Sequence, residues 1–136
     1  MFRLSKTRRE IRIIVLQVLC ESDTVDHEPK DVLSRILKEE SIVTDSSNFA
    51  HQLVHNVLEN IHELDNIIEA YATTWPISQM PIVDKNLLRM AIAEMQFGLD
   101  SPQGAVVNEV VEIAKIFGSE SSPGFINGVL GSLLDR

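Results

Sequence analysis

The residues from Val106 to Leu134, which read VVNEVVEIAKIFGSESSPGFINGVLGSLL, decide the fold of the C-terminal part of this chain. Apolar residues recur there at three- and four-residue spacing in two runs, the pattern of amphipathic helices. Gly118 ends the first run, and Ser122-Pro123 is expected to supply an N-cap and a first-turn proline for the second. Gly128 flanks the inner face of the second run, where a missing side chain permits close helix contact. The stretch therefore predicts a packed helical hairpin.

The rest of the chain also predicts helices. No stretch alternates polar and apolar residues between turn signals, so strands are not expected. Apolar periodicity predicts helices at about 6–21, after Pro29, from about 45 to 71, and over 82–97. The long third segment allows a break near Asn60 to His62, which the pattern leaves open. The segment 82–97 is apolar over most of its circumference and is expected to be the central helix of an all-α fold.

Two proline steps divide the chain. Trp75-Pro76 and Met80-Pro81 interrupt the pattern within residues 73–81, because each proline biases its predecessor away from helix. We expect an N-terminal helical half at 1–74 and a C-terminal helical half at 81–136, with Trp75 filling the seam. With 136 residues, the two halves form a single domain, 1–136, long enough to bury a core.

Several classes of protein are excluded by what the sequence lacks. It contains one cysteine, Cys20, so disulfides and cysteine-based zinc sites are excluded, and Cys20 is expected in the core. No phosphate loop, nucleophile elbow or dinucleotide fingerprint is present, so neither enzyme activity nor a cofactor is expected. No apolar run is long enough for a membrane span and no signal peptide is visible, which predicts a cytoplasmic protein.

Three histidines lie along one edge of the segment 45–71. His51 and His55 have the four-residue spacing of a helical zinc pair, and His62 follows on the same edge. They border the apolar stripe without cysteine ligands nearby. A solvated helix edge is therefore favoured over a metal site, and no bound metal is expected.

The charge of the chain is divided unevenly. The net charge is −8, but the first twelve residues hold five basic residues and one acidic residue. The basic residues are Arg3, Lys6, Arg8, Arg9 and Arg12, and the acidic residue is Glu10. Ser5 or Thr7 is the expected cap of the helix that begins there, where cations oppose the helix dipole. A solvated helix start and a bound anion both remain open, since a compact basic end can hold phosphates even on an acidic body.

Two carboxylates project onto the apolar side of the segment 82–97. Asp84 and Glu94 each need a partner there, because an unpaired buried charge costs several kcal/mol. A helix cap for Asp84 and an internal ion pair for Glu94 are one interpretation, and contact with a partner protein is the other. The two residues lie about 15 Å apart along a helix, too far for a general acid/base pair.

Three blocks of sequence match a known family. They are Arg8-Arg9-Glu10-Ile11-Arg12 with Leu16-Gln17-Val18-Leu19, then Val83-Asp84-Lys85 with Leu87-Leu88-Arg89-Met90-Ala91 and Glu94, and finally residues 107–115 with Phe117-Gly118 and Phe125-Ile126-Asn127-Gly128-Val129-Leu130. These blocks resemble the opening helix, the central helix and the last two helices of the transcription antitermination factor NusB family. The resemblance implies a single NusB-like domain, a bundle of about seven helices in two halves.

The resemblance also implies a function without catalysis. Family members bind boxA, a short single-stranded RNA element of nascent ribosomal RNA transcripts, together with the small-subunit ribosomal protein NusE. The complex joins RNA polymerase and suppresses premature termination, with no membrane involved. Two other interpretations remain: a protein-interaction module of the same fold with little RNA binding, and a fragment related to the NusB-like domain of ribosomal RNA cytosine methyltransferases.

The resemblance assigns provisional roles to eight residues. Phosphate contacts are expected from Lys6, Arg8, Arg9 and Arg12. Gln17 adds a hydrogen bond if the RNA tracks along the first helix. Phe125 either stacks on a base or belongs to the core. Asp84 and Glu94 are the candidates for contact with the ribosomal protein.

Overall fold

Seven α-helices and one short 3-10 helix make up the part of the chain that this computed structural model describes, residues 6–25, 27–97 and 101–135. In chain order they are α1 (Arg8–Thr24), α2 (Pro29–Glu39), α3 (Thr44–Glu59), α4 (Ile61–Tyr71), η1 (Ile77–Gln79), α5 (Ile82–Gln96), α6 (Gln103–Phe117) and α7 (Ser122–Leu134). No strand occurs in the described residues, so the prediction of an all-α fold of about seven helices is confirmed.

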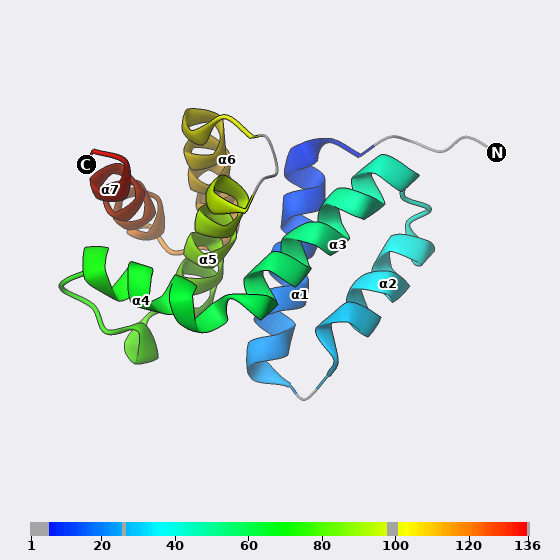
Figure 1. The fold of residues 1–136 in the computed structure, drawn as a ribbon, viewed down its shortest axis with the longest axis horizontal. Coiled ribbons are helices and arrows are strands. Elements are labelled where there is room, and N and C mark those ends of the chain that lie inside the picture. Colours follow the sequence, from blue (N-terminus) through cyan, green and yellow to red (C-terminus); the bar gives the residue numbers. More distant parts are fainter. Residues whose placement is uncertain (1–5, 26, 98–100, 136) are drawn as a thin grey trace.

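Helix α5 is the centre of the fold, as its apolar circumference predicts. It contacts α1, α3, α4, α6 and α7, and Figure 1 shows it between the two groups of helices. Its fully buried side chains include Leu87, Leu88 and Ile92. Burying each such side chain contributes roughly 1.5–3 kcal/mol, so this one helix anchors much of the core.

The other helices form two groups around α5. Helices α1, α2 and α3 pack on one another, α7 packs on α4 and α6, and Figure 1 shows α4 and α7 on the side of α5 away from α1, α2 and α3. The open question of a break near Asn60 is resolved, because α3 ends at Glu59 and α4 begins at Ile61. Helix α4 contacts α5 and α7 as well as α3. By packing, α4 therefore groups with the C-terminal helices, although the predicted boundary at residues 73–81 assigns it to the N-terminal half.

A capping box starts α1. The Thr7 side-chain oxygen accepts a hydrogen bond from the Glu10 backbone N–H at 3.1 Å, and the Thr7 N–H donates to Glu10 Oε1 at 2.9 Å. These bonds lower the pKa of Glu10. Thr7 is thus the N-cap, while Ser5, the other expected cap, lies outside the described residues. The helix continues to Thr24, past its expected end at residue 21.

An internal ionic cluster joins α1, α4 and α5. The arginine of this cluster, Arg89, lies on α5 and is only 6% exposed. Its Nε and Nη2 atoms donate to the two carboxylate oxygens of Asp65 at 2.7 and 2.8 Å, and Nη1 donates to Asp23 at 3.2 Å. Burial lowers the pKa of Arg89, but the Asp65 hydrogen bonds and charge raise it further, so the group stays charged. This cluster therefore holds α1 and α4 against α5.

The hairpin of α6 and α7 turns tightly at Gly118. A Cβ atom at Gly118 would lie 2.6 Å from the Ser122 Cβ atom, so this close approach requires glycine. The N-cap of α7 is Ser121, and the Ser122 hydroxyl turns inward instead, so the predicted capping role of Ser122 is wrong. Gly128 has open space around it and is exposed, so its predicted close helix contact is also wrong.

Candidate nucleic-acid interface

The four basic residues predicted to contact phosphates occupy different environments at the start of α1. Arg8 and Arg9 are exposed, Lys6 is half-buried, and Arg12 is buried at 5% exposure. Arg3 lies outside the described residues. A phosphate binds where N–H donors are both accessible and unshared, so each cation has to be judged by its partners.

Surface carboxylates already pair with two of these cations. Lys6 Nζ lies 3.1 Å from Glu40 Oε1 and 3.8 Å from Glu10 Oε2. Arg9 Nε donates to Glu109 Oε2 at 2.7 Å, which ties α1 to α6 and raises the pKa of Arg9. Exposed pairs of this kind contribute about 0–1 kcal/mol, so an RNA phosphate can compete for either cation.

Arg8 has a different neighbour. Its guanidinium carbon lies 3.9 Å from the ring centroid of Phe49 on α3. Within the described part of the chain, no carboxylate forms a salt bridge with Arg8. Among Lys6, Arg8, Arg9 and Arg12, Arg8 is therefore the one that shares none of its N–H donors with a carboxylate in the described part of the chain.

Arg12 lies inside the protein. Its Nε donates to Glu94 Oε1 at 2.8 Å and its Nη2 to Glu94 Oε2 at 2.5 Å, and Glu94 is only 2% exposed. The predicted internal ion pair of Glu94 is confirmed. This burial conflicts with the expected phosphate contact of Arg12 and with the expected partner contact of Glu94. The charge of each side chain is already paired with that of the other.

Gln17 and Lys6 lie on one side of α1. Both line a surface hollow, and the other lining residues are Glu10, Ile13, Ile14 and Glu40. Nine residues separate Gln17 from Arg8, which at about 100° per residue places them on opposite faces of the helix. The structure therefore brings Gln17 to Lys6 and not to Arg8.

Phe125 lies at the first turn of α7 and is half-buried. Its ring meets Trp75 edge to face, with centroids 5.3 Å apart and planes at 69°. The start of α7 contacts the start of α5, where the Ser122 hydroxyl donates to Asp84. The basic end contacts α5 through the pair of Arg12 and Glu94, and Glu94 lies about 15 Å further along the helix than Asp84. Phe125 is therefore not brought beside the basic end, and its half-exposed ring flanks a separate hollow between α4 and α7.

Asp84 is also an interior residue, at 1% exposure. Its Oδ1 accepts a hydrogen bond from the Ser122 hydroxyl at 2.7 Å, and Ser122 Oγ accepts from the Ser119 N–H at 2.9 Å. Burial raises the pKa of Asp84, and the Ser122 hydrogen bond opposes that shift in part. The expected contact of Asp84 with a partner protein conflicts with this burial, and the carboxylate instead holds the turn between α6 and α7 against α5.

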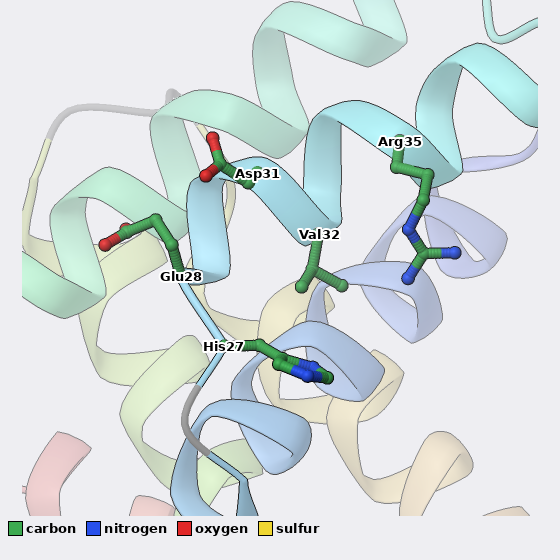
Figure 2. A pocket seen from close by; sticks show the side chains of 5 residues that line it. All are labelled: His27, Glu28, Asp31, Val32 and Arg35. Carbon is green, nitrogen blue, oxygen red and sulfur yellow. The ribbon is translucent and has the colours of Figure 1, made fainter.

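A further hollow lies at the start of α2. Figure 2 shows the carboxylates of Glu28 and Asp31 pointing away from the His27 ring, while Arg35 lies on the far side of Val32. These side chains do not converge on one point. In residues 6–25, 27–97 and 101–135, no group of three or more His, Cys, Asp or Glu side chains is placed to hold a metal ion. The three predicted edge histidines, 51, 55 and 62, are exposed.

Three residues of this interface escaped the sequence analysis. Phe49 lies four residues before Leu53 on the inner face of α3, a spacing that marks it as apolar and inward but not as a partner of arginine. Glu40 and Glu109 carry no local signal of their pairing, because each meets its cation across the fold. Glu109 is 100 residues from Arg9 in the sequence.

None of the described helices combines the length and apolar character that crossing a bilayer requires.

Comparison with known proteins identifies close sequence relatives. The family model described as NusB family matches residues 9–135. The transcription antitermination protein NusB of Roseiflexus sp. (strain RS-1) is 43% identical over 135 residues, covering 98% of this chain and 95% of its own. The protein of the same name from Chloroflexus aggregans (strain MD-66 / DSM 9485) is 44% identical over 136 residues, covering 98% of this chain and 91% of its own.

Solved structures agree with the sequence comparison. T. maritima NusB superposes with a TM-score of 0.89 at 29% identity, covering 98% of this chain and 94% of that one. A complex of the antitermination factors NusB and NusE with dsRNA contains a chain that superposes with a TM-score of 0.84 at 28% identity, covering 94% of this chain and 96% of that one.

Proposed function

This chain belongs to the NusB family, and on that premise we propose that it is a transcription antitermination factor that binds boxA-type RNA together with the ribosomal protein NusE. The complex acts on RNA polymerase during transcription of ribosomal RNA. The role is regulatory, without catalysis or a cofactor, and it is carried out in the cytoplasm. The relative solved with NusE and dsRNA supports NusE and RNA as partners.

The observation that carries the RNA-binding part is the basic start of α1. Lys6, Arg8 and Arg9 gather there on a chain whose net charge is −8. A compact basic end on an acidic body binds a polyanion at one place and repels it elsewhere. We assign the phosphate contacts to these three residues, with Gln17 as a further contact on the Lys6 side of α1.

The remaining predicted residues receive other roles. Arg12 and Glu94 hold α1 on α5, and Asp84 holds the turn before α7 through Ser122. In this role the three residues contribute to binding of RNA and protein indirectly, by fixing the positions of α1 and of the turn before α7. The half-exposed ring of Phe125 is kept as a candidate for base stacking at a second place, because its edge contact with Trp75 leaves part of the ring uncovered.

One observation favours weak binding of RNA by this chain alone. Glu10, Glu40 and Glu109 lie among the cations at the start of α1 and reduce their net attraction for phosphate. NusE then supplies the additional contacts, since two linked contacts bind more tightly than either one. The alternative is a protein-interaction module of the same fold. In that case the carboxylates neutralise the cations so far that little RNA binding remains.

A titration separates the two functions. Labelled single-stranded boxA RNA is titrated with the full chain, with NusE and with their mixture, and a duplex RNA of the same length is run beside it. The proposal predicts weak binding to the chain alone and much tighter binding to the mixture. Tight binding of NusE without any capture of RNA by the mixture would establish the interaction module instead.

A further inference from the structure

We propose that Phe49 is a positioning residue for RNA binding, because its ring holds the Arg8 guanidinium where an RNA phosphate can reach it. This inference rests on the proposed function and deepens it. It adds a residue on α3 to a surface that the sequence places on α1 alone.

The geometry brings an aromatic ring of α3 under the first residue of α1. The guanidinium carbon of Arg8 lies 3.9 Å from the centroid of the Phe49 ring, within the range of a cation–π contact. Phe49 is 7% exposed and belongs to the core, so its ring has a defined position. Arg8 is exposed, so the guanidinium covers the ring and presents its other side to solvent.

The charged neighbours single out Arg8. Lys6 and Arg9 are engaged by exposed carboxylates, and Arg12 by the buried Glu94. A ring contact uses the face of a guanidinium, whereas a carboxylate uses its N–H donors. Among the described basic residues of this end, Arg8 is thus the one whose position is restrained while its five N–H donors stay unshared with carboxylates.

The restraint has a consequence for affinity. A free arginine loses rotamer freedom when it binds a phosphate, and this loss weakens binding. A guanidinium already held against a ring loses less. The Phe49 ring also lies 5.6 Å from the guanidinium carbon of Arg12, which Glu94 fixes to α5, so the position of Arg8 is linked to the interior.

The test uses four variants of the full chain, each titrated with boxA RNA in the presence of NusE. Arg8→Ala should weaken binding about tenfold, since it removes charge-assisted hydrogen bonds. Arg8→Lys should lose most of that factor, because lysine keeps the charge without the stacked plane. Phe49→Leu should weaken binding about threefold. In the Arg8→Ala background, Phe49→Leu should have no further effect, because the ring then has no arginine to hold.

Two controls keep the test specific. Arg35→Ala removes an exposed arginine of α2 that pairs with Glu39, and it should leave affinity unchanged. Thermal melting of each variant gives the folded fraction, so a loss of core packing is separated from a loss of positioning. Arg8→Lys needs no core change and is informative even if Phe49→Leu unfolds the chain.

Two results would overturn the inference. One is an Arg8→Lys variant that binds RNA as tightly as the wild type, which would show that Arg8 contributes only its positive charge. The other is a Phe49→Leu effect of equal size with and without Arg8, which would make Phe49 a packing residue. In both cases the wild type still binds RNA with NusE, so the proposed function survives. If the wild type itself does not bind, the proposed function fails first and this inference fails with it.

Discussion

The Arg12 guanidinium and the Glu94 carboxylate form a two-point ion pair inside the protein, with exposures of 5% and 2%. The pair joins α1 to the central helix α5 across 82 residues of sequence. Both charged groups are removed from water in the folded protein, so the attraction between them has to offset the free-energy cost of their desolvation. The pair therefore holds α1 on the core, with both charges directed at each other inside the protein.

Removing one member of this pair should destabilise the fold strongly. Arg12→Met leaves a buried, unpaired carboxylate, which costs roughly 3–5 kcal/mol in free energy of unfolding. The double variant Arg12→Met, Glu94→Leu should be closer to the wild type, because no charge is then stranded. Urea denaturation followed by circular dichroism measures both. The exposed pair of Lys115 and Glu112 on α6, 3.2 Å apart, provides a control, since Lys115→Ala should cost under about 1 kcal/mol. A single variant as stable as this control would contradict the account.

Removing the carboxylate that pairs with Arg9 should strengthen RNA binding. Glu109→Gln removes the negative charge that pairs with the Arg9 guanidinium next to the proposed phosphate site. We expect a gain in affinity of up to about fivefold at low salt, the equivalent of one surface pair. Glu120→Gln makes the same change in net charge on an exposed residue after α6 and should leave the affinity nearly unchanged. Equal gains from both variants would mean that only net charge matters.

Stability should depend on pH through Asp84. Burial raises the pKa of Asp84 in the folded state above its ordinary value of 3.8, so between the two pKa values the folded state binds more protons than the unfolded state. Stability then falls as the pH rises through that window. Asp84→Asn keeps an oxygen to accept the Ser122 hydrogen bond but does not titrate. The unfolding free energy of the variant minus that of the wild type should therefore rise with pH above 3.8 and then level off. A difference that falls with pH would contradict the assignment.

Phe125→Ala should be visible in the fluorescence of Trp75, the single tryptophan of the chain. The substitution removes the ring that meets Trp75 edge to face at 5.3 Å, so the tryptophan emission should shift toward that of solvent-exposed indole. Because Phe125 is half-buried, the stability should fall by about 1–3 kcal/mol. Unchanged emission and stability would contradict the packing role. Titrating the folded variant with RNA then tests the base-stacking role separately.

The sequence predicted the helices well because their signals are local. Apolar spacing identified α5 as the central helix. The two proline steps within residues 73–81 interrupt the pattern, and they predicted the separation of α4 from α5. The break at Asn60 was left open, since the apolar stripe continues on both sides of it, whereas the contacts of α4 with α5 and α7 form across the fold. The prediction for Gly128 was wrong because a glycine in a helix occurs both at close contacts with another helix and on open surface, and the sequence does not distinguish the two.

The candidate site was less predictable, because its residues meet across the fold. The charge pattern located the basic end of α1 but could not tell which cations are free. That distinction depends on Glu94 and Glu109, which lie 82 and 100 residues from their arginines. The contact of Arg8 with Phe49 likewise depends on how α3 packs on α1. Periodicity orients a side chain toward the core or toward solvent, but it does not identify its neighbour.

The salt dependence of RNA binding tests the central claim, that the start of α1 holds RNA phosphates, most directly. The affinity of the chain with NusE for boxA RNA is measured across a salt series for the wild type, for the triple variant Lys6→Ala, Arg8→Ala, Arg9→Ala, and for the control Arg35→Ala. The account predicts that the triple variant binds more weakly and that its slope of log affinity against log salt is shallower by up to about 2, or about 0.7 for each lost contact. The control should keep the wild-type slope. A triple variant with the wild-type affinity and slope would contradict the account.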